Sequence, residues 1–217
     1  MERRLRWAIG VYGLIAVVAV LWGVLAGRPN LWTHPHPWIA LAPPWTTMFA
    51  IVAGVAVGAF TILATRALVR TARWAQHLHK DFRELFGPLT WAQILALGIV
   101  PGFAEELLFR GAMQPSLGWL LSSLLFGAIH VARVRSFWAW PIWATLMGLV
   151  FGALYAATGQ LLAPVIAHCL INTSNLRFIV THDPEPDRLP HSKGLSPPHL
   201  IGTRQRAGTV GSSSAKP

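Results

Sequence analysis

Residues Ala104–Gly111 read AEELLFRG, and the interpretation of the whole chain starts from this short acidic stretch. Glu105 and Glu106 lie inside an otherwise apolar run, where a carboxylate costs about 2.5–3.5 kcal/mol on membrane-insertion scales and usually serves a function. Arg110 follows Glu106 by four residues, so the two side chains share a helical face and can neutralise each other. Glu105 has no such local partner and is available for chemistry. The alternative is that both acids end a helix at the lipid headgroups.

The composition is that of a membrane protein. Of the 217 residues, 53% are hydrophobic and 12% are charged, and the mean hydropathy is +0.48. Such a chain is predicted to be all-α, a polytopic bundle of about six transmembrane helices. The single cysteine, Cys169, excludes an internal disulfide and provides no redox motif.

The predicted spans follow the apolar runs. We expect them at about 7–26, 45–64, from 89 onward, 117–132, 137–158 and 161–180, with the third helix broken at Pro101-Gly102. The first run could instead be a cleaved signal peptide, but its length and the RPNLW that follows favour a retained span. Residues 65–86 are basic and amphipathic, which predicts a helix lying on an anionic membrane face or a solvated helix extension.

The net charge of +10 comes from an uneven distribution of basic residues. With six spans, 1–6, 65–88, the RVR turn at 133–135 and the C-terminal tail fall on one side of the membrane. Of the 18 Lys and Arg, sixteen fall on this side when Arg177 at the end of the last span is counted, and only Arg28 and Arg110 lie elsewhere. This pattern predicts a multi-pass protein with a cytoplasmic N-terminus and tail, and it explains the charge without nucleic acid.

Four polar side chains from three predicted spans fall in one layer. A helical rise of about 1.5 Å per residue places Glu105, His130, His168 and Asn172 roughly 13–21 Å below the outer turns near Pro115 and Gly159. A single His or Asn in a membrane helix can simply hydrogen-bond a neighbouring helix. Four of them in one layer indicate a functional site.

This set of side chains suits hydrolysis of an amide. A buried Glu105 can act as a general base toward water. Glu105, His130 and His168 could also bind a divalent metal such as zinc with an open position for water. Alternatively, the histidines and Asn172 could donate hydrogen bonds to an oxyanion. The sequence leaves the metal open.

The chain resembles the CPBP family of intramembrane endopeptidases, also called Abi, which includes the type II CAAX prenyl endopeptidases. That family carries EExxxR, FxxxH and HxxxN in this order. The corresponding segments here are EELLFR at 105–110, FGAIH at 126–130 and HCLIN at 168–172.

The resemblance implies an intramembrane protease with Glu105 as the water-activating base. His130, His168 and Asn172 would complete the catalytic centre, and Glu106, Arg110 and Phe126 would support it. It further implies a bacterial or archaeal inner membrane and a membrane-anchored protein or peptide as substrate. The mechanism is either glutamic or metal-dependent.

Three parts are therefore expected along the chain. Residues 1–88 form two N-terminal spans and the basic interfacial helix, 89–180 form a catalytic four-span core, and 181–217 form a disordered cytoplasmic tail. Two other functions stay open. One is a non-catalytic protein of the same fold, in bacteriocin immunity or scaffolding, and the other is an ion-coupled transporter that uses the buried carboxylate.

Overall fold

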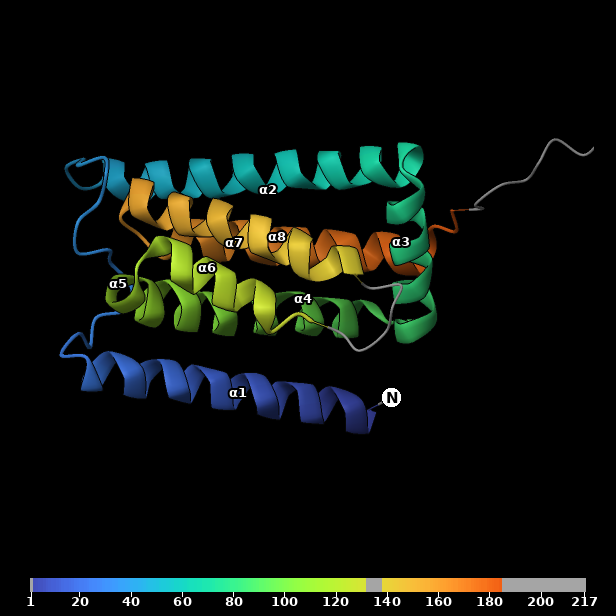
Figure 1. Cartoon of the computed structure of the whole chain (residues 1–217), viewed down its shortest axis with the longest axis horizontal. Coiled ribbons are helices and arrows are strands. Elements are labelled where there is room, and N and C mark those ends of the chain that lie inside the picture. The colour runs from blue at the N-terminus through green and yellow to red at the C-terminus, as the bar shows by residue number, and fades with distance from the viewer. Residues whose placement is uncertain (1, 132–137, 185–217) are drawn as a thin grey trace, which may run out of the picture. The chain divides into compact units, whose positions relative to one another are not determined.

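The computed structural model describes residues 2–131 and 138–184. They form a bundle of long helices (Figure 1). The elements in order are α1 (Glu2–Leu25), α2 (Trp45–Thr71), α3 (Arg73–Phe86), α4 (Trp91–Glu106), the π-helix η1 (Leu107–Met113), α5 (Gln114–Leu117), α6 (Trp119–Ala128), α7 (Ala139–Thr158) and α8 (Leu162–Thr181). No strand is present in the described ranges, only an isolated bridge between Thr33 and Gln160. The predicted all-α polytopic bundle is confirmed.

In the described parts of the chain, four helical segments are long and apolar enough to cross a membrane. They are Leu5–Leu25, Trp45–Thr71, Trp91–Leu117 and Ala139–Thr158. The fourth predicted span is shorter than expected, because α6 ends at Ala128 after 10 residues. Its length of about 15 Å covers only half of a bilayer core. α8 has 20 residues and carries several polar side chains.

α8 lies at the centre of the bundle and packs against α2 and α4. Glycines allow this close approach: a methyl group at Gly54 of α2 would come within 2.5 Å of the carbonyl oxygen of Ala163. On α4, a methyl group at Gly98 would collide with Thr173. Small residues at such crossings let membrane helices pack backbone to backbone. The polar side chains of α8 are thereby held against neighbouring helices.

The break predicted at Pro101-Gly102 is wrong. α4 continues through Pro101 to Glu106, and the irregularity comes afterwards, in the π-helical turn from Leu107 to Met113. A proline is tolerated inside a membrane helix because local adjustments and neighbouring groups compensate for the lost backbone hydrogen bond. The π-helical turn lies directly beside the two acids, and such turns are frequent at functional sites.

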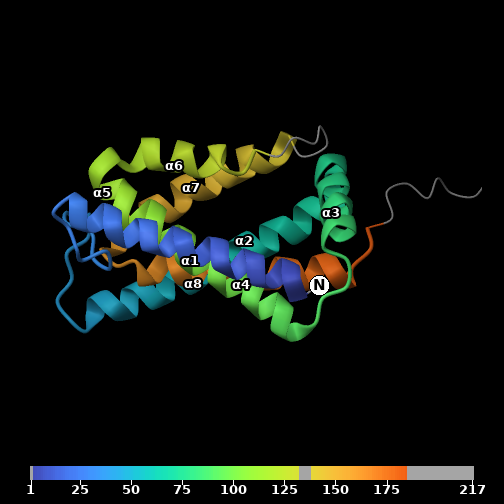
Figure 2. The same cartoon turned by 90° about the horizontal axis from the view of Figure 1, so that it is seen from below.

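The basic stretch at 65–86 is not one helix. α2 continues to Thr71, the backbone turns at Ala72 (φ −114°, ψ 120°), and α3 then crosses the ends of the long helices (Figures 1 and 2). The buried residues of α3 include Ala75, Leu78 and His79, so one face of this helix packs on the bundle.

The N-terminal end of α1, α3 and the C-terminal end of α8 lie at the same end of the bundle (Figure 1). Residues 27–44 lie at the opposite end, where the backbone of Trp32 and Trp38 hydrogen-bonds to Leu161 and Ala156. The predicted RVR turn at 133–135 lies outside the described residues, as does the predicted disordered tail (181–217) from residue 185 onward; Thr181 is the last residue of α8.

Candidate active site

Two adjacent carboxylates at the end of α4 enter different environments. Glu105 is 5% exposed and Glu106 is 0% exposed. Neighbouring residues on a helix point about 100° apart, so the two side chains cannot share partners easily. Glu106 points into the protein interior, whereas Glu105 lines a cavity.

The carboxylate of Glu106 is paired as the spacing predicts. Nη1 of Arg110 donates to Oε1 of Glu106 at 2.9 Å, and Nη2 of Arg110 donates to the carbonyl oxygen of Gly148 at 3.1 Å. The guanidinium also lies 4.3 Å from the ring centroid of Phe126. The buried cation therefore has a counter-ion, a carbonyl acceptor and an aromatic face.

His168 reaches Glu106 from α8. Its Nδ1 lies 2.7 Å from Oε1 of Glu106. Because Arg110 balances the charge of this carboxylate, Glu106 is an acceptor and Nδ1 of His168 carries the proton. The ring stacks on Phe151 at 5.0 Å between centroids. These contacts fix the imidazole and turn Nε2 toward Glu105.

His130 enters the site from the turn that follows α6, not from within the helix as predicted. Its Nδ1 lies 2.6 Å from the carbonyl oxygen of Phe126. A carbonyl only accepts, so this nitrogen is the donor. The ring lies between Phe126 and Trp140, at centroid distances of 4.8 and 5.6 Å. As in His168, Nε2 is left facing the cavity.

The two imidazoles converge on Glu105. Nε2 of His130 and Nε2 of His168 each lie 3.9 Å from Oε2 of Glu105. This distance is too long for a direct hydrogen bond and suits a bridging water. The sequence thus predicted a meeting of side chains that the structure contains, although these contacts do not by themselves assign a role to any of them.

Asn172 completes the predicted set. It lies one turn after His168 on α8 and lines the same cavity. Within the described residues, the side chain of Asn172 has no hydrogen-bond partner, so its amide is available to a ligand.

Tyr12 was not predicted. It lies on α1, which packs against α4 and η1, and its hydroxyl lies near the side chain of Glu105 on the same cavity. A polar ring inside the otherwise apolar run at 7–26 was the available signal. Its partner could not be found from sequence, because the packing of α1 on α4 brings together residues far apart in the chain.

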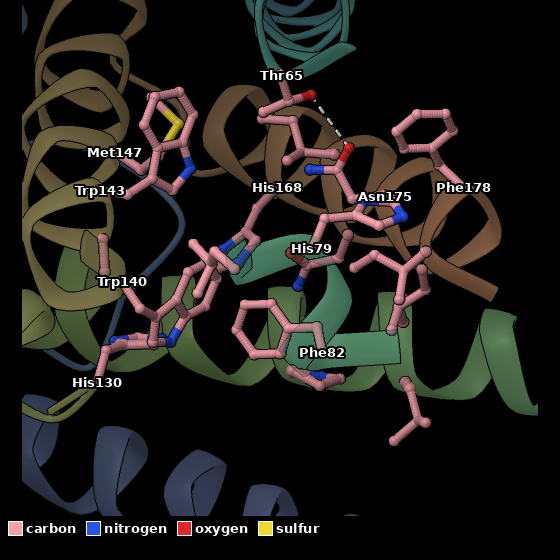
Figure 3. A pocket seen from close by; sticks show the side chains of 18 of the residues that line it. Thr65, His79, Phe82, His130, Trp140, Trp143, Met147, His168, Asn175 and Phe178 are labelled. Carbon is pink, nitrogen blue, oxygen red and sulfur yellow. Dashed lines mark hydrogen bonds between the residues drawn. The ribbon is translucent and has the colours of Figure 1, made fainter. Parts of the chain in front are cut away.

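A cavity of about 500 Å³ connects these groups, and aromatic and aliphatic side chains from α1, α2, α3, α4, α6, α7 and α8 line most of it (Figure 3). His130 and His168 lie on its wall together with Trp140 and Trp143 (Figure 3). Such a lining suits an apolar segment of a ligand, with few polar groups to orient it.

The donor set of Glu105, His130 and His168 is chemically suited to zinc. In the part of the chain that the structure describes, however, no group of three or more His, Cys, Asp or Glu side chains is arranged to hold a metal ion. The separations of 3.9 Å from Oε2 of Glu105 to both imidazoles are wider than the roughly 3.4 Å between ligands of a tetrahedral zinc site. We therefore assign no step of the mechanism to a metal.

Comparisons with known proteins agree with this architecture. Residues 87–174 match the model of the Rce1-like family, described as type II CAAX prenyl endopeptidase Rce1-like. The matched region contains the buried acids, both histidines and Asn172. The resemblance predicted from the three motifs is confirmed over residues 87–174, which match the model of this family.

Two proteins of Bacillus subtilis (strain 168) are similar to the chain. The protein named "Uncharacterized protein YpbD" is 34% identical over 122 residues, which cover 55% of this chain and 63% of that relative. The protein named "Putative membrane peptidase YdiL" is 33% identical over 103 residues, which cover 44% of this chain and 38% of the relative. The chain thus spans less than two thirds of either relative. No solved structure matches.

Proposed function

We propose that this protein is an intramembrane endopeptidase in which Glu105 activates a water molecule. One observation carries the proposal: Oε2 of Glu105, buried in the cavity, lies 3.9 Å from Nε2 of both His130 and His168. The match to the Rce1-like family supports the reaction class.

The first step is attack of water on a peptide carbonyl. Glu105 takes one proton from the water while the oxygen forms a bond to the carbonyl carbon. A water between the carboxylate and the imidazoles has acceptors on several sides, because both histidines donate through Nδ1 to other groups. These acceptors orient the water, which general-base catalysis requires.

The second step is collapse of the tetrahedral intermediate. Its oxyanion needs hydrogen-bond donors, and the free amide of Asn172 supplies one. The C–N bond then breaks, and Glu105 returns its proton to the leaving amine, so the carboxylate is regenerated.

Glu106, Arg110 and Phe126 hold the site in shape. Glu106 fixes the tautomer of His168 by accepting from Nδ1. Arg110 balances the charge of Glu106, and Phe126 supplies both the carbonyl that orients His130 and a ring under the guanidinium. Tyr12, whose hydroxyl lies near Glu105, would orient this carboxylate by donating a hydrogen bond to it.

The substrate is proposed to be a membrane-anchored protein or peptide that enters the cavity from the bilayer. Residues 1–88 would help to enclose the cavity, 89–180 would carry the chemistry, and 181–217 would lie outside the core. We further infer that the end of the bundle with α3 faces the cytoplasm, because basic residues gather in the segments that meet there. Labelling of single cysteines placed at Lys80 and Asn30 in intact cells tests this orientation.

The activity is tested by mapping cleavage products. The purified protein is reconstituted with a membrane-protein extract, and new peptide termini are identified by mass spectrometry. Wild type should generate termini that are absent with Glu105→Gln and present with Glu84→Gln, an exposed acid on α3 that serves as the control. If wild type generates no termini, the non-catalytic alternative is favoured. Equal cleavage by Glu105→Gln would refute the assignment of the base.

A further inference from the structure

A charged side chain lines the same cavity outside the catalytic centre. Arg66, near the C-terminal end of α2, is partly buried and contacts α8. Nη1 donates to Oδ1 of Asn175 at 2.8 Å, and Nη2 donates to the carbonyl and hydroxyl oxygens of Ser174 at 2.9 Å each. The guanidinium carbon lies 3.9 Å from the ring centroid of Phe178. The group is therefore held in one position rather than extended to solvent.

Among the described residues, no carboxylate balances the charge of Arg66. In the described parts of the chain, the Arg–carboxylate ion pairs are Arg83–Asp183 and Arg110–Glu106, and neither involves Arg66. All its hydrogen-bond partners are neutral acceptors. A partly buried guanidinium stays charged, and removing it from water without a counter-ion is costly. Arg110, at the centre of the bundle, is by contrast fully paired.

Asn175 extends this site. Its Oδ1 accepts from Nη1 of Arg66 and from the hydroxyl of Thr65 at 3.2 Å (Figure 3). Its Nδ2 is then free to donate, and within the described residues it has no partner. Thr65, Arg66 and Asn175 all line the cavity that contains Glu105. The pocket therefore offers hydrogen-bond donors and a positive charge, which together suit a carboxylate.

We propose that Arg66 and Asn175 bind the free C-terminal carboxylate of the substrate. The proposal rests on the endopeptidase function and assigns a specificity site to residues that include Arg66, outside the matched range 87–174. His168 and Asn175 are seven residues apart on α8, which corresponds to about 10 Å along the helix. An extended peptide covers this distance with about three residues. A substrate anchored at Arg66 can thus present a bond near its C-terminus to Glu105.

The test compares two peptides that differ only at the C-terminus. One ends in a free carboxylate and the other in a carboxamide, and both carry the same apolar anchor and fluorophore. Wild type should cleave the acid with a kcat/KM about ten to one hundred times higher, as expected for a hydrogen bond to a charged group. Arg66→Gln should lose this preference, so that its kcat/KM values for the acid and the amide become equal. Arg70→Gln, an exposed arginine one turn further along α2, should keep it.

Three results would overturn the proposal. The first is equal cleavage of acid and amide by wild type. The second is an equal loss of kcat/KM on both peptides in Arg66→Gln. The third is a preference for the acid that disappears when neutral nanodiscs are replaced by anionic ones. The last result would assign Arg66 to a lipid phosphate.

A binding measurement separates this proposal from the proposed function. Anisotropy of the same peptides is measured with full-length Glu105→Gln in neutral nanodiscs, with and without Arg66→Gln. If wild type cleaves neither peptide but binding still prefers the acid through Arg66, the endopeptidase proposal fails and the carboxylate site stands. If binding shows no such preference, the carboxylate site is rejected.

Discussion

Two adjacent glutamates at the C-terminal end of α4 have opposite environments. Glu106 is enclosed in the protein interior and paired with Arg110 and His168. Glu105, by contrast, faces a cavity and has two imidazoles at 3.9 Å and a tyrosine hydroxyl nearby. One position in the sequence separates a structural carboxylate from one available for chemistry. The difference arises because adjacent helical residues point in different directions and only one of them has an arginine at i+4.

The largest effect on stability is expected from replacing the enclosed Glu106. Glu106→Gln leaves the buried guanidinium of Arg110 without its counter-ion and removes the acceptor for His168. Breaking one partner of a buried pair costs about 3–5 kcal/mol. Thermal unfolding in detergent should show a marked drop in Tm for Glu106→Gln and little change for Glu105→Gln. Equal drops would mean that the two acids do not differ in this way.

The crossing of α4 and α8, which holds both glutamates in place, can be weakened by a substitution outside the site. Gly98→Ala places a methyl group against Thr173, where the backbones of α4 and α8 meet. Overpacking of this kind costs about 1–3 kcal/mol. The same unfolding assay should report a smaller loss than for Glu106→Gln, and Gly10→Ala, at an open position on α1, is the control. Unchanged stability would show that α4 and α8 can separate freely.

Removal of the hydroxyl of Tyr12 tests the environment of Glu105, the acid that faces the cavity. Tyr12→Phe keeps the ring and removes the hydroxyl group that we propose as a hydrogen-bond donor to Glu105. A hydrogen bond to a charged group is worth about 1.5–3 kcal/mol, so kcat should fall about tenfold or more. Tyr155→Phe, at a buried tyrosine outside this contact, is the control. A kcat for Tyr12→Phe equal to that of wild type would remove Tyr12 from the site.

The sequence predicted which side chains meet better than it predicted the path of the backbone around them. The EELLFR spacing predicted the pair Glu106–Arg110, and the three motifs predicted that Glu105 and the two histidines meet. The break at Pro101-Gly102 was wrong, because a membrane helix can accommodate proline, and the π-helical turn leaves no clear sequence signal. The contact of Tyr12 with Glu105 and the position of His130 after α6 depend on tertiary packing, which periodicity does not contain.

The smallest expected effect concerns α3, which lines the cavity at its basic end. Burial lowers the pKa of His79 from its ordinary value of 6.5; the hydrogen bond to the backbone of His182 opposes this shift, and the charges of His182, Arg66 and Arg83 add to it. The unfolded state then binds the proton more readily than the folded state, so stability is present above about pH 6.5 and is lost as pH falls below it.

Amide hydrogen exchange of α3 should therefore increase slightly between pH 7 and pH 5.5, after correction for the intrinsic rate. His79→Gln should remove this dependence, whereas His77→Gln, exposed on the same helix, should keep it. A dependence that persists in His79→Gln would assign it to another group.

The most direct test of the central claim is the cleavage rate of Glu105→Gln on a mapped substrate, measured beside wild type in the same nanodiscs. If Glu105 takes the proton from water, the rate should fall about 100- to 10,000-fold while Tm stays near that of wild type. A rate within about twofold of wild type would contradict the account.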